Sequence, residues 1–143
     1  YDLPTEAQWE YACRAGTSSS YSFGDSCRGR LANCAGNHPH GTIFRGPYLE
    51  RTTVVGTYPS NPWGFFDMHG NVWEWCRDWK ADYADGPVTD PVRIEAGGYR
   101  VNRGGGWFSK ARLCRSALRN QNAPDFTSEY IGFRLALTQR FDP

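Results

Sequence analysis

From Gly16 to about Pro59 the chain shows little helical or strand periodicity, and this long irregular stretch limits what it can fold into. Loops of this length are uncommon in compact domains and are usually functional, or held by an ion or a disulfide. The 143 residues include 16 Gly and nine Pro, which favour turns, and 15% aromatic residues, which can build a core by side-chain burial. We therefore expect a loop-rich α+β fold with little regular secondary structure.

One helix is expected over residues 6–15. Thr5 and Gln8 have the spacing of a capping box, in which each side chain accepts a hydrogen bond from the other residue's backbone N–H. Trp9 and Cys13 recur at helical spacing and are expected to face the core.

Short strands are expected over residues 53–58, 72–76, 99–103, 111–119 and 132–137. The last range has the clearest pattern, because apolar residues from Ile131 to Leu137 alternate with Gly132, Arg134 and Ala136. The tryptophans Trp73, Trp75, Trp79 and Trp107 are expected in the core.

Length and charge limit the domain count and the partners. The length suits a single domain, residues 1–143. Its 16 basic and 15 acidic residues leave a net charge of +1, which is no electrostatic footprint for nucleic acid or an anionic membrane. No apolar run approaches the ~18 residues of a membrane span, so we expect no membrane insertion.

The five cysteines leave two options open: buried thiols throughout, or a single structural disulfide among them. No Cys-x-x-Cys pair occurs, which disfavours a zinc ribbon or a thioredoxin-type site. The compartment therefore stays open, with the cell surface or secretion as part of a longer protein as one option.

Motifs for other chemistries are weak. The histidines are His38, His40 and His69; the first two are expected as solvated loop residues and the third as structural. No Gly-x-Ser-x-Gly elbow occurs. The glycines 104–106 lack the Lys-Ser/Thr of a phosphate loop and are expected to pack backbone beside Trp107.

The last third alternates patterned blocks with unpatterned side chains. The blocks are residues 103–107, 114–119, 122–125 and 131–136. Ordered scaffold that alternates with such side chains is typical of a binding surface. Phe108, Phe126 and Tyr130 would be large apolar groups in loops, and clustered exposed aromatics usually mark an interface.

Four blocks in order resemble one family: Leu3-Pro-Thr-Glu-Ala-Gln-Trp-Glu-Tyr-Ala12, Pro62-Trp-Gly-Phe-Phe-Asp-Met-His-Gly-Asn-Val-Trp-Glu-Trp75, Arg100-Val-Asn-Arg-Gly-Gly-Gly-Trp107 and Ile131-Gly-Phe-Arg-Leu-Ala136. The chain resembles the formylglycine-generating-enzyme (sulfatase-modifying factor) domain, a version of the C-type lectin fold. The resemblance implies a further N-terminal portion before residue 1, so we expect a fragment or a trimmed version. Relatives include oxidases, iron enzymes and pure binding proteins, so the site must decide the function.

The enzyme alternatives are disfavoured by the residues. The family's copper oxidases use two cysteines after the Arg-x-Gly-Gly block; here the first position falls near Ser109, the second has no counterpart, and Cys114 stands alone. No copper is therefore expected. Some relatives also link the helix to the late cysteine segment, which suggests a Cys13–Cys114 disulfide, although their position lies closer to Ser116.

The C-terminal region resembles the variable proteins of diversity-generating retroelements, which implies a variable region over residues 103–137. In that class mutagenesis acts at template adenines, and Asn codons can reach most of the residue types found between the blocks here; Lys110 and Glu129 need Lys template codons. The implied ligand-binding residues are Phe108, Ser109, Lys110, Arg112, Leu113, Leu118, Phe126, Thr127, Ser128, Glu129 and Tyr130.

The resemblance also implies a structural calcium ion in the turn before Trp75. Its ligands would be the carboxylates of Asp67 and Glu74 and the carbonyls of Gly70 and Val72. Without the ion, these carboxylates are turn and surface groups. A second family site begins at Asn33, where no downstream acidic partner is evident.

The residues favour a diversified binding protein for a protein or cell-surface ligand that performs no chemistry. Two alternatives stay open. One is a metal-dependent oxidoreductase of the formylglycine-generating type, or a fragment of one. The other is a structural module inside a larger protein.

Overall fold

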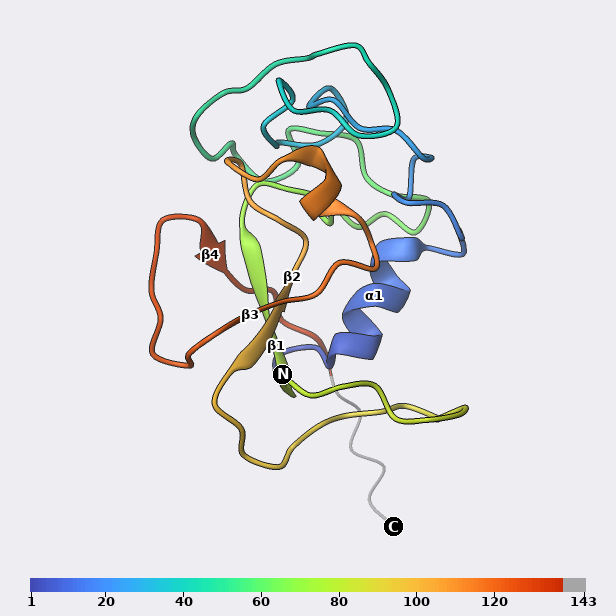
Figure 1. Ribbon diagram of the computed structural model, residues 1–143, viewed down its shortest axis with the longest axis vertical. Coiled ribbons are helices and arrows are strands. Elements are labelled where there is room, and N and C mark those ends of the chain that lie inside the picture. Colours follow the sequence, from blue (N-terminus) through green and yellow to red (C-terminus); the bar gives the residue numbers. More distant parts are fainter. Residues whose placement is uncertain (138–143) are drawn as a thin grey trace.

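The computed structural model describes residues 1–137 and is built around a small sheet with one helix against it (Figure 1). The elements are α1 (Glu6–Arg14), β1 (Trp73–Trp79), β2 (Arg100–Arg103), a 3₁₀ turn η1 (Ala111–Cys114), β3 (Asn120–Asn122) and β4 (Ile131–Gly132). The strand order is β3-β2-β1-β4; β1 pairs antiparallel with β2 and parallel with β4, and β2 pairs antiparallel with β3.

Helix α1 begins as predicted. Thr5 Oγ1 accepts from the Gln8 N–H at 3.1 Å, and Gln8 Oε1 accepts from the Thr5 N–H at 2.9 Å. Trp9 and Cys13 face inward and form one core cluster with Met68, Cys76 and Val101. The amide side chain of Asn61 closes the other end of the helix by donating to the Ala12 carbonyl at 2.7 Å.

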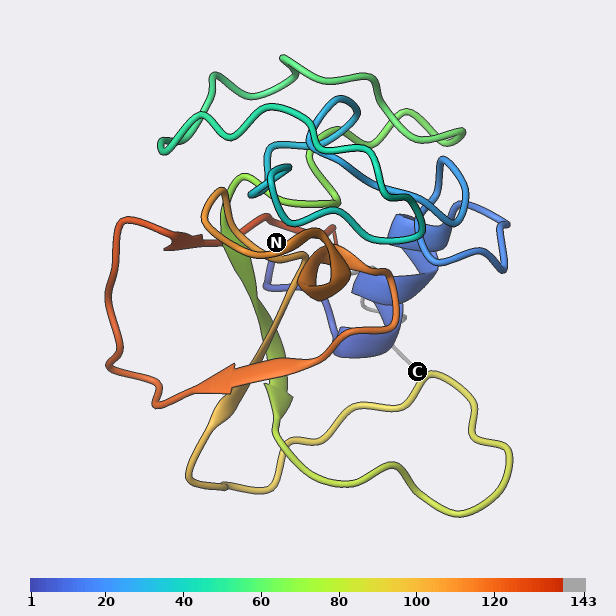
Figure 2. The same cartoon turned by 45° about the horizontal axis from the view of Figure 1, so that its top comes forward.

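The long irregular stretch wraps over one end of the sheet, as both views show (Figures 1 and 2). Its core is a second cluster, which consists of Tyr21, Cys27, Ala32, Cys34, Ala111 and Cys114. Asn71 organises the polar part, because its Oδ1 accepts from Asn33 Nδ2 at 3.1 Å and from the Thr53 N–H at 2.9 Å. Side-chain amides thus satisfy backbone groups that a strand ladder would otherwise satisfy.

Several predicted strands are wrong. Residues 53–58 form turns, because Thr53 bonds to a side chain and has no neighbouring strand. Residues 111–119 form η1 and a turn. The Ala111 N–H donates at 3.1 Å to the carbonyl of His38, which lies in a loop and not in a strand. The last predicted strand keeps only β4 and one bridge between Ala136 and Asp2.

Of the four tryptophans expected in the core, Trp73 is buried, and Trp75, Trp79 and Trp107 are half-buried. The ring of Trp79 stacks under the Arg100 guanidinium, 3.8 Å from its carbon to the ring centroid. In this part of the sheet a cation, and not apolar packing, covers the aromatic face.

A fully buried arginine ties the helix to the sheet. The Arg103 side chain is 0% exposed; its guanidinium hydrogen-bonds to Glu10 and to the Leu118 carbonyl, and its Nε lies 3.5 Å from Glu6 Oε1. Glu6 is also bound by Arg119 at 2.6 and 2.7 Å. The charges are therefore paired where water is excluded, which a buried arginine requires.

In the part of the chain described, no helix is long and apolar enough to cross a bilayer.

Candidate functional site

The two unpatterned segments, residues 108–113 and 126–130, come together through their aromatic rings. The ring centroids of Phe108 and Tyr130 lie 4.5 Å apart, and those of Phe126 and Tyr130 lie 6.2 Å apart. Trp107 meets Phe108 edge-on at 5.7 Å. We call Trp107, Phe108, Phe126 and Tyr130, with Tyr48, the aromatic cluster.

Tyr48 is a member that sequence reasoning missed. Its ring lies nearly parallel to that of Trp107, at a centroid distance of 6.4 Å, although the two residues are far apart in the chain. No periodicity surrounds Tyr48, so only the tertiary fold could place it here. The irregular loops therefore contribute to the same surface as the C-terminal segments.

Backbone hydrogen bonds hold both segments in place. The Ser109 carbonyl accepts from the Ala35 N–H at 2.9 Å, and the Tyr130 carbonyl accepts from the Trp73 N–H at 2.8 Å. The Trp107 N–H donates to the Asn71 carbonyl at 2.8 Å. The segments are thus anchored to the loops and to β1 through backbone atoms, and these bonds do not involve their side chains.

Exposure of the predicted binding residues differs along the segments. Exposed members are Phe108, Lys110, Arg112, Thr127 and Glu129. Half-buried members are Leu113, Leu118, Phe126, Ser128 and Tyr130. The exposed members alternate with half-buried ones, as in a shaped surface with aromatic anchors.

Ser109 was predicted to be a ligand-binding residue on the surface, but it is buried. It is 2% exposed, and its Oγ accepts from the Gly106 N–H at 3.0 Å. It closes the turn after the glycine block and is a structural residue. Leu118 lies in a turn whose carbonyl binds Arg103, away from any ring contact among the described residues.

The glycine block packs tightly, as predicted. Gly105 has a φ of +80°, and a Cβ there would lie 2.5 Å from Cys114 Sγ. This close approach leaves no space for a side chain or a phosphate group.

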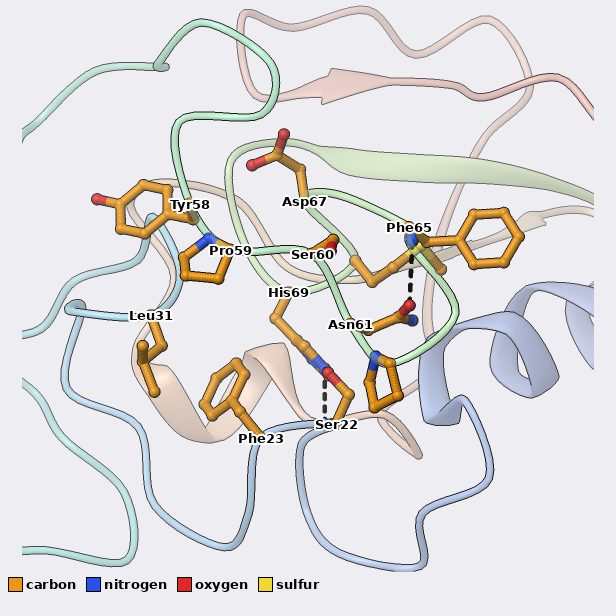
Figure 3. A pocket seen from close by; sticks show the side chains of 12 residues that line it. Ser22, Phe23, Leu31, Tyr58, Pro59, Ser60, Asn61, Phe65, Asp67 and His69 are labelled. Carbon is orange, nitrogen blue, oxygen red and sulfur yellow. Dashed lines mark hydrogen bonds between the residues drawn. The ribbon is translucent and has the colours of Figure 1, made fainter.

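His69 lines a cavity of ≈ 60 Å³ beneath the loops, together with Ser22, Phe23, Tyr58 and Asp67 (Figure 3). Its Nδ1 lies 2.8 Å from the Cys114 carbonyl and its Nε2 accepts from the Ser22 N–H at 3.0 Å, which assigns the proton to Nδ1. Burial lowers the pKa of His69 to about 4. The neutral ring links two backbone segments by hydrogen bonds, which is the structural role that the sequence predicted. The cavity has room for a few waters.

All five cysteines are buried free thiols, so the expected Cys13–Cys114 disulfide is not formed. Cys13 Sγ faces the Met68 carbonyl at 3.7 Å and the His69 ring, whereas Cys114 belongs to the second core cluster with Cys27 and Cys34. Burial raises the pKa of Cys13 to about 12, and of the described residues no three His, Cys, Asp or Glu come together as a metal-binding group.

The expected calcium turn has ligands of unequal availability. Asp67 Oδ2 accepts from the Gly56 N–H at 2.8 Å, which leaves Oδ1 for an ion. Glu74 is more occupied, because Arg134 donates to both of its oxygens, at 2.5 and 2.7 Å, and Trp9 Nε1 donates at 2.7 Å. A calcium ion here would share the Glu74 carboxylate with the Arg134 guanidinium. Its affinity should therefore be lower than if all four expected ligands were free to bind it.

A further groove, of ≈ 860 Å³, lies between α1 and the loop that follows β1. It is lined by α1 side chains, among them Glu10 and Arg14, and by loop residues such as Tyr83, Val88 and Val92. No sequence pattern indicated it.

Comparison with known proteins identifies the family. Residues 1–139 match the sulfatase-modifying factor enzyme 1-like (FGE-sulfatase) domain. The chain is 40% identical to the formylglycine-generating enzyme of Streptomyces coelicolor, over 94% of this chain and 46% of that protein. It is 37% identical to the serine/threonine-protein kinase pkn1 of Chlamydia pneumoniae, over 94% of this chain but 20% of that protein.

Two solved structures share the fold. Treponema denticola variable protein 1 superposes with a TM-score of 0.79 and 31% identity, over 92% of this chain and 45% of that one. PvdO from Pseudomonas aeruginosa superposes with a TM-score of 0.75 and 30% identity, over 92% of this chain and 50% of that one. The chain thus spans about half the length of these proteins or less, and the predicted loop-rich α+β fold of C-type-lectin type is confirmed.

Proposed function

Because the chain belongs to the sulfatase-modifying factor enzyme 1-like domain family, whose fold serves more than one purpose, we propose that it is a ligand-binding domain of the variable-protein type. It displays the side chains of residues 108, 110, 112, 113 and 126–130 on a fixed scaffold and binds a protein or another cell-surface ligand. The similarity to Treponema denticola variable protein 1 supports this proposal.

The meeting of the two segments carries the proposal. Phe108 and Tyr130 come from segments that the chain separates by β3 and a turn, yet their rings pack at 4.5 Å. Lys110, Arg112 and Glu129 are exposed around them. A core of aromatic anchors within a charged rim is the usual anatomy of a recognition surface.

Sequencing the locus across a population of cells tests this function. Codons 108, 110, 112, 113 and 126–130 should differ between cells, with a nearby near-copy that differs where it has adenine. Ser109 should stay small, because its buried hydroxyl closes the Gly106 turn. An invariant segment without a second copy would contradict diversification.

The second candidate is an oxidase of the formylglycine-generating type. The 40% identity to the Streptomyces coelicolor enzyme favours it. Incubation of the protein with copper, oxygen, a thiol reductant and a cysteine-containing peptide tests it by mass spectrometry. The reductant supplies the two electrons that convert the second oxygen atom to water. Conversion of the peptide cysteine to an aldehyde, with its sulfur released as sulfide and with no conversion when copper is left out, would establish this activity.

Calcium forms part of the proposal as a structural ion. Asp67 and the carbonyls of Gly70 and Val72 would hold it, with Glu74 shared with Arg134. The ion would order the turn that leads into β1 and thereby the anchor at Trp73.

A further inference from the structure

The loops around the aromatic cluster carry an excess of positive charge. Residues 16–51 and 104–118 contain seven basic and two acidic side chains, and the segment 125–130, which carries Phe126 and Tyr130, adds the acidic Asp125 and Glu129. The seven, which we call the basic face, are Arg28, Arg30, Arg45, Arg51, Lys110, Arg112 and Arg115. The acidic residues of these loops are Asp25 and Glu50.

These loops are joined at one end of the molecule. The Ala35 N–H donates to the Ser109 carbonyl, directly before Lys110, and the Ala111 N–H donates to His38. The Gly46 N–H donates to the Gly36 carbonyl, which brings Arg45 to the same region. Both views place the loops of residues 28–51 beside η1 (Figures 1 and 2).

The cations of the basic face form no ion pair with a carboxylate among the described residues. Over residues 1–137, every ion pair within 4.0 Å involves other cations: Arg14, Arg77, Arg93, Arg103, Arg119 and Arg134. Arg30, Arg45, Arg51, Lys110 and Arg112 are exposed to solvent. Arg28 lies over the Phe44 ring, with 5.9 Å from its guanidinium carbon to the ring centroid.

Acidic side chains gather at the other end. The end of β1 and the loop that follows it, residues 77–95, hold five carboxylates and three basic groups, and the acidic ones are Asp78, Asp82, Asp85, Asp90 and Glu95. This loop projects from the opposite end of the molecule to the basic face (Figure 1). The near-neutral net charge of +1 therefore conceals two ends of opposite sign.

We propose that the partner of the binding surface is an acidic protein segment, whose carboxylates meet the basic face and whose apolar side chains meet the aromatic cluster. This inference rests on the proposed binding function and names its partner chemistry. Six of the seven cations are arginines, which bind carboxylates through two parallel hydrogen bonds and are enriched at protein interfaces, where lysine is depleted.

A compact acidic segment fits better than a long polyanion. A nucleic acid that followed the surface would reach the acidic end, where like charges repel it. The rings of Phe108, Phe126 and Tyr130 also pack tilted against one another, so they offer few free faces for stacked bases. Exposed aliphatic groups in the same loops, Leu31, Ile43 and Leu49, suit a protein partner.

Selection from a random-peptide library displayed on phage tests the inference with the unmodified domain. Enriched peptides should be rich in Asp and Glu, and a synthetic acidic peptide of that sequence should bind more weakly as salt rises. The combined variant Arg45→Glu and Lys110→Glu should lower its affinity by at least about tenfold. The matched control, Arg93→Glu on the acidic end, should leave the affinity within about twofold.

The outcomes separate this inference from the proposed function. If the combined charge variant binds as well as the parent while Phe108→Ala with Tyr130→Ala loses binding, the binding surface stands and the acidic partner is wrong. If neither variant changes binding, both fail. Enrichment of neutral or basic peptides, or tighter binding of single-stranded RNA than of the acidic peptide, also overturns the inference. A thermal melt of each variant checks that it is folded.

Discussion

The sulfur atoms of Cys27 and Cys34 lie 3.7 Å apart in the second core cluster, with Cys114 in the same cluster. Refolding with glutathione disulfide should join these two: each thiol loses one proton, and the electron pair reduces the oxidant to two glutathione thiols. The closed loop is short, so the bond should raise the free energy of unfolding by about 2 kcal/mol. Peptide mapping should find Cys27 linked to Cys34.

Cys76→Ser is the control for this pairing, because Cys76 lies in the other core cluster. It should leave the linkage intact, whereas Cys34→Ser should abolish it. A Cys34–Cys114 linkage, or no linkage after refolding, would contradict the prediction.

Replacement of Arg103 by Met should be severely destabilising. The side chain is 0% exposed, and its loss leaves Glu6 and Glu10 short of a buried partner. We expect the free energy of unfolding to fall by about 3–5 kcal/mol, measured by urea denaturation. Arg77→Met, which breaks an exposed pair with Asp2 at 3.4 Å, should cost less than about 1 kcal/mol. Equal losses in both variants would show that Arg103 adds no more than a surface pair.

The neutral His69 should make stability depend on pH. Burial lowers its folded-state pKa to about 4, below the ordinary 6.5, so the unfolded chain binds the proton more readily. The stabilisation is therefore complete above pH 6.5 and is lost as pH falls toward 4. Between pH 6.5 and 5 the loss should be about 1.6 kcal/mol.

Comparison of unfolding free energies at these two pH values, in the parent and in His69→Asn, checks the effect. The variant should lose less stability on acidification. His38→Asn, at an exposed loop position, is the matched control and should behave as the parent does. The prediction is wrong if the parent and His69→Asn respond equally to pH.

Calcium at millimolar concentration should raise the melting temperature over that in a chelator. The gain follows from binding to the folded state alone, about 1 kcal/mol at a few times the dissociation constant. Asp67→Asn should remove the difference, while Asp25→Asn, in a separate loop, should retain it. A melting temperature indifferent to calcium would show that Arg134 and Trp9 satisfy the Glu74 carboxylate without an ion.

The helix could be predicted from the sequence because its signals are local: Thr5 and Gln8 bond to each other's backbone three residues apart. The last strand misled because its alternation does not reflect burial. Phe133, Leu135 and Leu137 are 65%, 61% and 70% exposed, so no face of that segment enters the core of the described chain.

Strand β3 carried no usable signal. Its residues Asn120 and Asn122 have low strand propensity, and they pair with β2 through the Asn102 side chain at 2.8 Å on each side. The aromatic residues Phe108, Phe126 and Tyr130 could be singled out from the sequence because they stand out among loops, and their rings do lie together. The place of Tyr48 in the aromatic cluster and the burial of Ser109 could not be predicted, since both residues contact segments that are distant in the chain.

The anchors at Ser109 and Tyr130 have a consequence for how this surface can change over generations. Each holds its segment to a distant part of the chain through a carbonyl oxygen. All twenty amino acids carry that atom, proline included. Mutation at residue 130 can therefore rewrite what is presented without altering the bond that presents it. Mutation at residue 109 would also keep the carbonyl bond but would remove the buried hydroxyl that binds the Gly106 N–H. Residue 130 can therefore vary between generations, whereas residue 109 cannot vary without loss of this turn.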